Sequence, residues 1–171
     1  MKDLDYIYDR AAFTELWERA TTNVSSLVSK PRDDLLYFDA IDIATQKFYE
    51  LAQTLLAFEN ATDFATLILK PDPFTYFHHL FGKYPGFIHR SGNTYEDFFE
   101  LMMRDPGGNI ADALGVNHER YVVMPLTGEW IAFGDRSWDI GVLYGPPAIM
   151  ECAKRFYPFF ITPPELFRVQ P

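Results

Sequence analysis

The first strong pattern in the sequence is an apolar stripe near the N-terminus. It repeats at steps of three and four residues and consists of Phe13, Leu16, Trp17, Ala20, Val24, Leu27 and Val28. That spacing places the side chains on one face of a helix, which we expect from about residue 10 to residue 29. Asp9 is a suitable N-cap, and Pro31 follows where the helix ends.

Capping residues and shorter stripes predict further helices before residue 115. They are a segment of about 41–58, a short helix after Asn60 that holds Phe64, Leu67 and Ile68, and the segments Phe74–Phe81, Tyr95–Arg104 and Ile110–Leu114. The Asp72-Pro73 pair combines an N-cap with a proline at the first helical position. Thr94 and Asp97 resemble a capping box, because each side chain can accept a hydrogen bond from the other residue's backbone.

The pattern becomes strand-like after residue 120. Three β-rich runs follow one another, at Tyr121–Leu126, Glu129–Gly134 and Trp138–Tyr144. Short turns separate them, so the spacing predicts an antiparallel three-stranded meander. Pro146-Pro147 then opens a last helix that runs to about Phe156.

These elements predict one α+β domain over residues 1–171. A helical part of about 9–115 should pack on a small C-terminal sheet of about 120–144, followed by the last helix and a tail over 147–171. The length of 171 residues and the hydrophobic fraction of 48% suit a single domain with a substantial core. One cysteine excludes an internal disulfide framework. The start, Met1–Asp5, does not have the apolar stretch of a signal peptide, which indicates a cytoplasmic protein that is not inserted in a membrane.

The chain is acidic, with a formal net charge of −9. Residues 1–60 hold 11 acids and 6 bases, residues 61–119 hold 8 and 4, and residues 120–171 hold 5 and 5, so the excess lies in the first two thirds. Such a surface repels nucleic acid and attracts basic proteins. The alternative is that the charge serves solubility alone.

The segment Arg32–Asp42 combines four aspartates with the apolar and aromatic residues Leu35, Leu36, Tyr37 and Phe38. We interpret this segment as an exposed link between helices that binds a protein partner, because aromatics supply anchors and acids supply steering. Its candidate residues are Asp33, Asp34, Tyr37, Asp39 and Asp42. The alternative is that the aromatic rings belong to the core.

A second candidate lies at the tip between two tryptophan-bearing strands, at Asp135, Arg136 and Trp138. Here too a purely structural interpretation is open, because an aspartate in a turn usually accepts hydrogen bonds from its own backbone.

Signals for catalysis or metal binding are weak. His78 and His79 are adjacent and point about 100° apart on a helix, which is unsuitable for one ion. Glu96 and Glu100 share a helical face and could join a distant histidine. An enzyme or small-ligand site would use His78, His79, His89 or Glu96 and Glu100. Cys152 lies on an apolar stripe, the usual setting of an inert thiol. We predict no metal and no cofactor.

The run Trp-Ile-Ala-Phe-Gly-Asp-Arg-Ser-Trp-Asp-Ile-Gly-Val-Leu, residues 130–143, resembles the hairpin of small acidic bacterial immunity proteins. The resemblance covers about 25 of the 171 residues and carries over no contact residue. It implies a non-enzymatic protein that occludes a cognate toxin. The alternatives are an enzyme or ligand-binding protein with a pocket between helices and sheet, and a structural or phage-derived accessory subunit. Neither the partner nor the oligomeric state follows from the sequence.

Overall fold

A computed structural model describes residues 4–107 and 119–171. Their strands form one six-stranded sheet in the order β1-β6-β5-β4-β2-β3, and every neighbouring pair is antiparallel. The strands are β1 (Leu36–Asp39), β2 (Phe64–Lys70), β3 (Gly86–His89), β4 (Arg120–Pro125), β5 (Ile131–Asp135) and β6 (Ile140–Tyr144).

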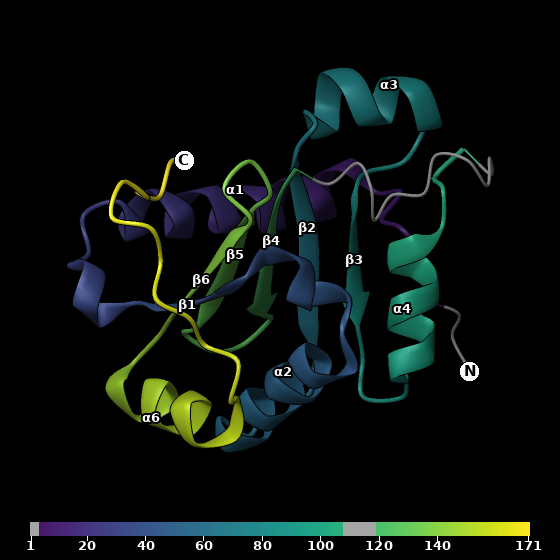
Figure 1. The fold of residues 1–171 in the computed structure, drawn as a ribbon. Helices are drawn as coiled ribbons and strands as arrows, with labels where there is room; N and C mark the ends of the chain where they lie inside the picture. Colours follow the sequence, from purple (N-terminus) through teal and green to yellow (C-terminus); the bar gives the residue numbers. More distant parts are fainter. Residues whose placement is uncertain (1–3, 108–118) are drawn as a thin grey trace.

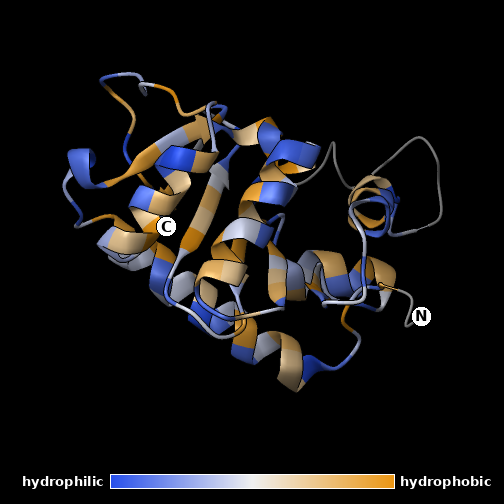
Figure 2. Cartoon of the chain, turned by 90° about the horizontal axis from the view of Figure 1, so that it is seen from below, coloured by the Kyte–Doolittle hydropathy of each residue, from blue (hydrophilic) through white to orange (hydrophobic). Residues whose placement is uncertain are grey.

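Helices cover both faces of this sheet. They are α1 (Arg10–Leu27), α2 (Gln46–Phe58), α3 (His78–Phe81), α4 (Tyr95–Met103) and α6 (Pro147–Phe156), together with the shorter helical turns η1 (Arg32–Asp34), η2 (Ala40–Ala44) and η3 (Pro73–Phe77). Figure 1 shows α1 behind the strands and α2 and α6 on the near side, below them. Hydrophobic and hydrophilic residues alternate along the helical ribbons in Figure 2, as expected for helices that bury one side.

The core accordingly consists of two apolar layers. One layer joins α2, α4 and α6 to the sheet and includes Leu55, Phe98 and Ile149, all almost fully buried. The other joins α1 and the C-terminal segment to the opposite face and includes Phe13 and Phe167. The sheet is therefore covered on both faces, which explains why its strands are mostly apolar and do not alternate with polar residues.

The C-terminal segment, residues 157–171, is well anchored despite its irregular backbone. The backbone nitrogen of Ile161 donates to the carbonyl oxygen of Tyr37 on the outer strand β1, and the Phe167 ring lies between Tyr37 and Trp138. The guanidinium of Arg32 donates to carbonyl oxygens of this segment, including that of Phe167 at 2.6 Å. The C-terminal segment thus fixes both the edge of the sheet and the turn η1.

Two glycines allow aromatic rings to lie directly on the sheet. A Cβ at Gly134 would lie 2.1 Å from the Tyr121 ring, and a Cβ at Gly141 would lie 2.2 Å from the Phe38 ring. Both glycines belong to the hairpin that carries the family resemblance. The packing of these two rings therefore accounts for the two glycines in the run of residues 130–143.

The predicted fold class is wrong. Helices and strands are interspersed along the chain, and the sheet has six strands rather than three C-terminal ones. Phe64, Leu67 and Ile68 belong to β2, where alternation places Phe64 and Ile68 on one face and Leu67 on the other. The expected acidic link contains β1, and β3 lies between two of the predicted helices.

Other local predictions are confirmed. Strands β4, β5 and β6 form the expected meander, and α1, α4 and α6 lie within two residues of their expected bounds. Asp9 caps α1, and Thr94 and Asp97 form the capping box. The predicted helix Ile110–Leu114 lies outside the described residues.

Candidate protein-binding surface

A hollow of about 330 Å³ lies where η1 and β1 meet the beginning of α6. Three carboxylates line it, those of Asp33, Asp34 and Glu151, and its apolar wall includes Leu36 and Met150. We call it the acidic hollow. It contains two of the predicted partner-binding residues, and its carboxylates come from segments more than 100 residues apart in the sequence.

The backbone around the acidic hollow is fixed from three sides. Leu36 of β1 pairs with Leu143 of β6, which continues through Gly145 into α6. The Arg32 guanidinium joins η1 to the C-terminal segment, and the Arg32 carbonyl oxygen accepts from the Tyr37 hydroxyl at 3.1 Å. Asp33 and Asp34 therefore stand on a short turn whose position is set by well-packed neighbours.

The charges of the acidic hollow are only partly compensated. Glu151 forms an ion pair with Lys154 at 3.0 Å. Asp33 and Asp34 are exposed, and within residues 4–107 and 119–171 neither side chain has an ion-pair partner. Two adjacent carboxylates beside an apolar wall suit a cationic side chain with an aliphatic stem, such as lysine or arginine.

Asp39 and Asp42 lie at the other end of β1. Asp39 caps η2 by accepting from the Ile41 backbone nitrogen at 3.1 Å. Asp42 accepts from the Tyr157 hydroxyl at 2.5 Å, and burial raises the pKa of the Asp42 carboxyl. Both aspartates thus take part in local structure and do not line the acidic hollow.

The predicted hairpin residues lie near that same end, because Asp39 pairs with Ile140 and Ile140 pairs with Asp135. Asp135 is only 1% exposed and accepts from the backbone nitrogen and hydroxyl of Ser137. Arg136 is half-buried and lies 3.8 Å from the Asp139 carboxylate. Trp138 is 38% exposed, with its ring against Phe167.

Two of the eight predicted contact residues are therefore not available on the surface. Tyr37 is buried, because its ring packs on Phe167 in the core, and Asp135 is buried as the aspartate that orders its own turn. For Tyr37 the structure favours a place in the core, and for Asp135 a role in its own turn. The other six predicted residues retain exposed or partly exposed side chains.

Within the described residues, the side chains named for an enzyme site do not come together. His78 stacks on Tyr84, whereas His89 is buried and stacks on Phe64. His79 is exposed on α3, and His118 lies outside the described residues. No group of three or more histidine, cysteine, aspartate or glutamate side chains in the described parts of the chain is arranged to hold a metal ion.

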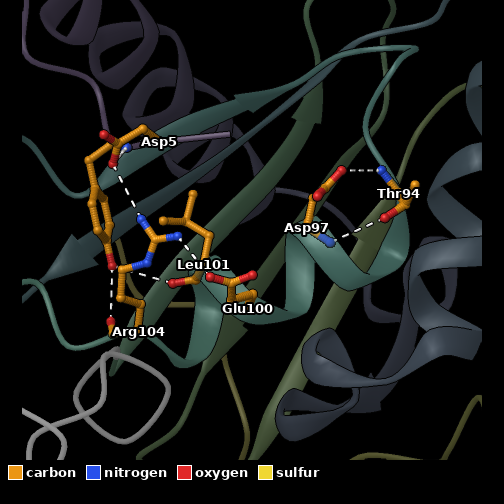
Figure 3. Close-up of polar contacts among 7 residues, drawn as sticks. Asp5, Thr94, Asp97, Glu100, Leu101 and Arg104 are labelled. Atoms are coloured by element: carbon orange, nitrogen blue, oxygen red, sulfur yellow. Dashed lines mark hydrogen bonds and ion pairs between the residues drawn. The ribbon is translucent and has the colours of Figure 1, made fainter. Parts of the chain in front are cut away.

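Three carboxylates near α4, those of Asp5, Asp97 and Glu100, already have partners. Figure 3 shows the reciprocal hydrogen bonds between Thr94 and Asp97, and the Arg104 guanidinium between Asp5 and Glu100. A hollow of about 380 Å³ lies among Leu4, Asp5, Asp97, Glu100 and Arg104, and we call it the α4 hollow. Each of its three carboxylates has a partner, which is Arg104 for Asp5 and Glu100 and the cap of α4 for Asp97.

Sequence reasoning missed Glu151, Met150 and Leu36 as neighbours of Asp33 and Asp34. The helical stripe of α6 predicts which of its residues face the core, but only the β1–β6 pairing brings α6 beside η1. The spacing of residues along the sequence does not predict the pairing of β1 with β6. The two adjacent aspartates were the one available signal.

Comparison of the chain with family models, curated proteins and solved structures found no match. None of the described helices is long and apolar enough to span a membrane.

Proposed function

We propose that this chain is a non-enzymatic cytoplasmic protein that binds a basic protein partner at the acidic hollow and masks it. The partner class that we favour is a bacterial toxin, neutralised by occlusion as in immunity proteins. The observation that carries the proposal is the pair Asp33 and Asp34, exposed and without ion pairs in the described residues, beside the apolar wall of Leu36 and Met150.

The acidic hollow acts in two stages. At a distance, the uncompensated carboxylates attract a positively charged surface and raise the association rate. On contact, a lysine or arginine stem lies along Leu36 and Met150 while its cationic head reaches Asp33 and Asp34. No bond is made or broken, so inhibition depends on what the bound chain covers.

The test measures binding to the candidate partner, which is the protein encoded by the adjacent reading frame, purified in an inactivated form. The double variant Asp33→Lys/Asp34→Lys should lower its association rate at least tenfold at low salt and flatten the dependence of that rate on ionic strength. Charged residues at the rim of an interface act mainly on association, which is why the rate is the readout.

The matched control is Glu15→Lys/Glu18→Lys on α1. Both glutamates are exposed, and α1 covers the opposite face of the sheet, so the control makes the same change of net charge away from the hollow. Equal slowing by the two variants would show a general charge effect and overturn the assignment to this hollow. Absence of any complex with the neighbouring product would overturn the proposed function.

A further inference from the structure

A second hollow lies on the other side of α6, between α6 and α2. It encloses about 600 Å³, and its lining includes Phe58, Ala148, Cys152, Phe156 and Arg155. We call it the apolar hollow. The Phe58 side chain at the end of α2 is 53% exposed, which is a large apolar surface to leave in water.

The two hollows are neighbours across one helix. Glu151 lines both of them, so α6 is the ridge between a negatively charged depression and an apolar one. Lys154 beside Glu151 is already engaged by that carboxylate at 3.0 Å. An interface that spans α6 would therefore have an acidic side and an apolar side, so one partner could meet both hollows at once.

We propose that the apolar hollow receives a large apolar side chain of the same basic partner whose cationic side chain enters the acidic hollow. This inference rests on the proposed function and adds the partner's second anchor. Because a helix with its side chains is about 10–12 Å wide, the partner presents the two anchors about 10 Å apart, as residues i and i+7 of a helix do.

The charged side chains that line the apolar hollow are those of Glu151 and Arg155. Charge opposes the binding of a second copy of this chain, because that copy carries the same net charge of −9. A basic protein gains from both hollows at once. Charged pairs at an exposed rim contribute little affinity, so the apolar anchor supplies most of the lifetime of the complex.

Cys152 provides a direct probe, since it is the one cysteine in the 171-residue sequence and lines the apolar hollow. The experiment measures the rate at which N-phenylmaleimide labels the intact protein, free and in complex with the inactivated product of the adjacent reading frame. We expect complex formation to slow labelling at least tenfold. The control protein carries Cys152→Ala with Ser26→Cys on the exposed side of α1, and its labelling rate should not change.

A pair of substitutions tests the anchor itself. Phe58→Ala should raise the dissociation rate of the complex at least tenfold and leave the association rate unchanged, unlike the charge reversals at Asp33 and Asp34. Tyr76→Ala is matched in exposure, 51% against 53%, and belongs to η3, which leads into α3 at the opposite end of the molecule from α2 and α6 (Figure 1); it should change neither rate.

The outcomes separate the two proposals. A complex in which Cys152 reacts at the free rate and Phe58→Ala dissociates normally overturns the apolar anchor and leaves the proposed function standing. Failure to form a complex removes both. Protection of Cys152 together with faster dissociation of the Phe58→Ala complex establishes the anchor.

Discussion

The acidic hollow and the α4 hollow contain similar numbers of carboxylates but differ in what those carboxylates contact. In the α4 hollow, Asp97 caps a helix while Asp5 and Glu100 share the Arg104 guanidinium. In the acidic hollow, Asp33 and Asp34 are exposed and have no ion pair within the described residues. The number of carboxylates therefore does not distinguish the two hollows; the partners that those carboxylates already have within the fold do.

The largest expected effect concerns Phe167, in the C-terminal segment that holds η1 in place beside the acidic hollow. Its fully buried ring fixes the C-terminal segment that Arg32 holds against η1. Phe167→Ala should lower the free energy of unfolding by about 3–5 kcal/mol, the usual cost of such a cavity. Chemical denaturation gives the value, with Leu166→Ala as control because Leu166 is 82% exposed. A loss at Phe167 no larger than at Leu166 would mean that the segment is not a support.

The cap of α4 offers the next largest contrast. Thr94→Ala removes a hydrogen bond from Asp97's backbone nitrogen and should cost about 1 kcal/mol of unfolding free energy. Asp33→Asn and Asp34→Asn should leave that quantity within about 0.5 kcal/mol of the original protein, because neither carboxylate stabilises the fold. The same denaturation curves measure all three variants. A large loss at either aspartate would contradict the distinction between the hollows.

Acid should destabilise the folded protein through protonation of His89, which lies near α4. Burial lowers the pKa of this imidazole, against the raising effects of the Thr94 carbonyl and the nearby Asp97 and Asp63 carboxylates. The unfolded chain therefore binds the proton at a higher pH than the folded protein. Stability should fall as the pH drops through about 6.5 and level off below the folded pKa.

The measurement is the pH dependence of unfolding free energy between neutral and mildly acidic pH. His89→Gln should flatten the slope in that range, whereas His79→Gln on exposed α3 should retain it. If unfolding free energy depended on pH equally in His89→Gln and His79→Gln, groups other than His89 would be responsible.

The smallest expected effect concerns Arg104. Its two ion pairs are partly exposed, with 42% of the Arg104 side chain accessible, so Arg104→Gln should cost only about 0.2–1 kcal/mol at low salt. The cost should shrink further at high salt because exposed charges are screened. Unfolding at two ionic strengths tests this. A loss that salt does not change would indicate that Arg104 stabilises α4 by packing instead.

The sequence predicted local structure better than long-range pairing, for identifiable reasons. The caps at Asp9 and Thr94 depend on residues three apart, so spacing alone predicts them. Strand β2 was mistaken for a helix because a short apolar run buried on both faces has no alternation to detect. Asp33 and Asp34 were correctly placed at the surface, but their neighbour Glu151 depends on the β1–β6 pairing, which no local pattern contains.

The strand order has a consequence for the timing of synthesis. The outer strand β1 (Leu36–Asp39) pairs only with β6 (Ile140–Tyr144) in the described sheet. It therefore cannot join the sheet until a segment about 100 residues further along the chain has been synthesised. Contacts of such long sequence separation form late and slow folding. A ribosome-bound fragment ending before residue 140 does not contain β6 or α6, so it cannot form the acidic hollow. Any recognition at the acidic hollow can begin only after β6 and α6 have been translated.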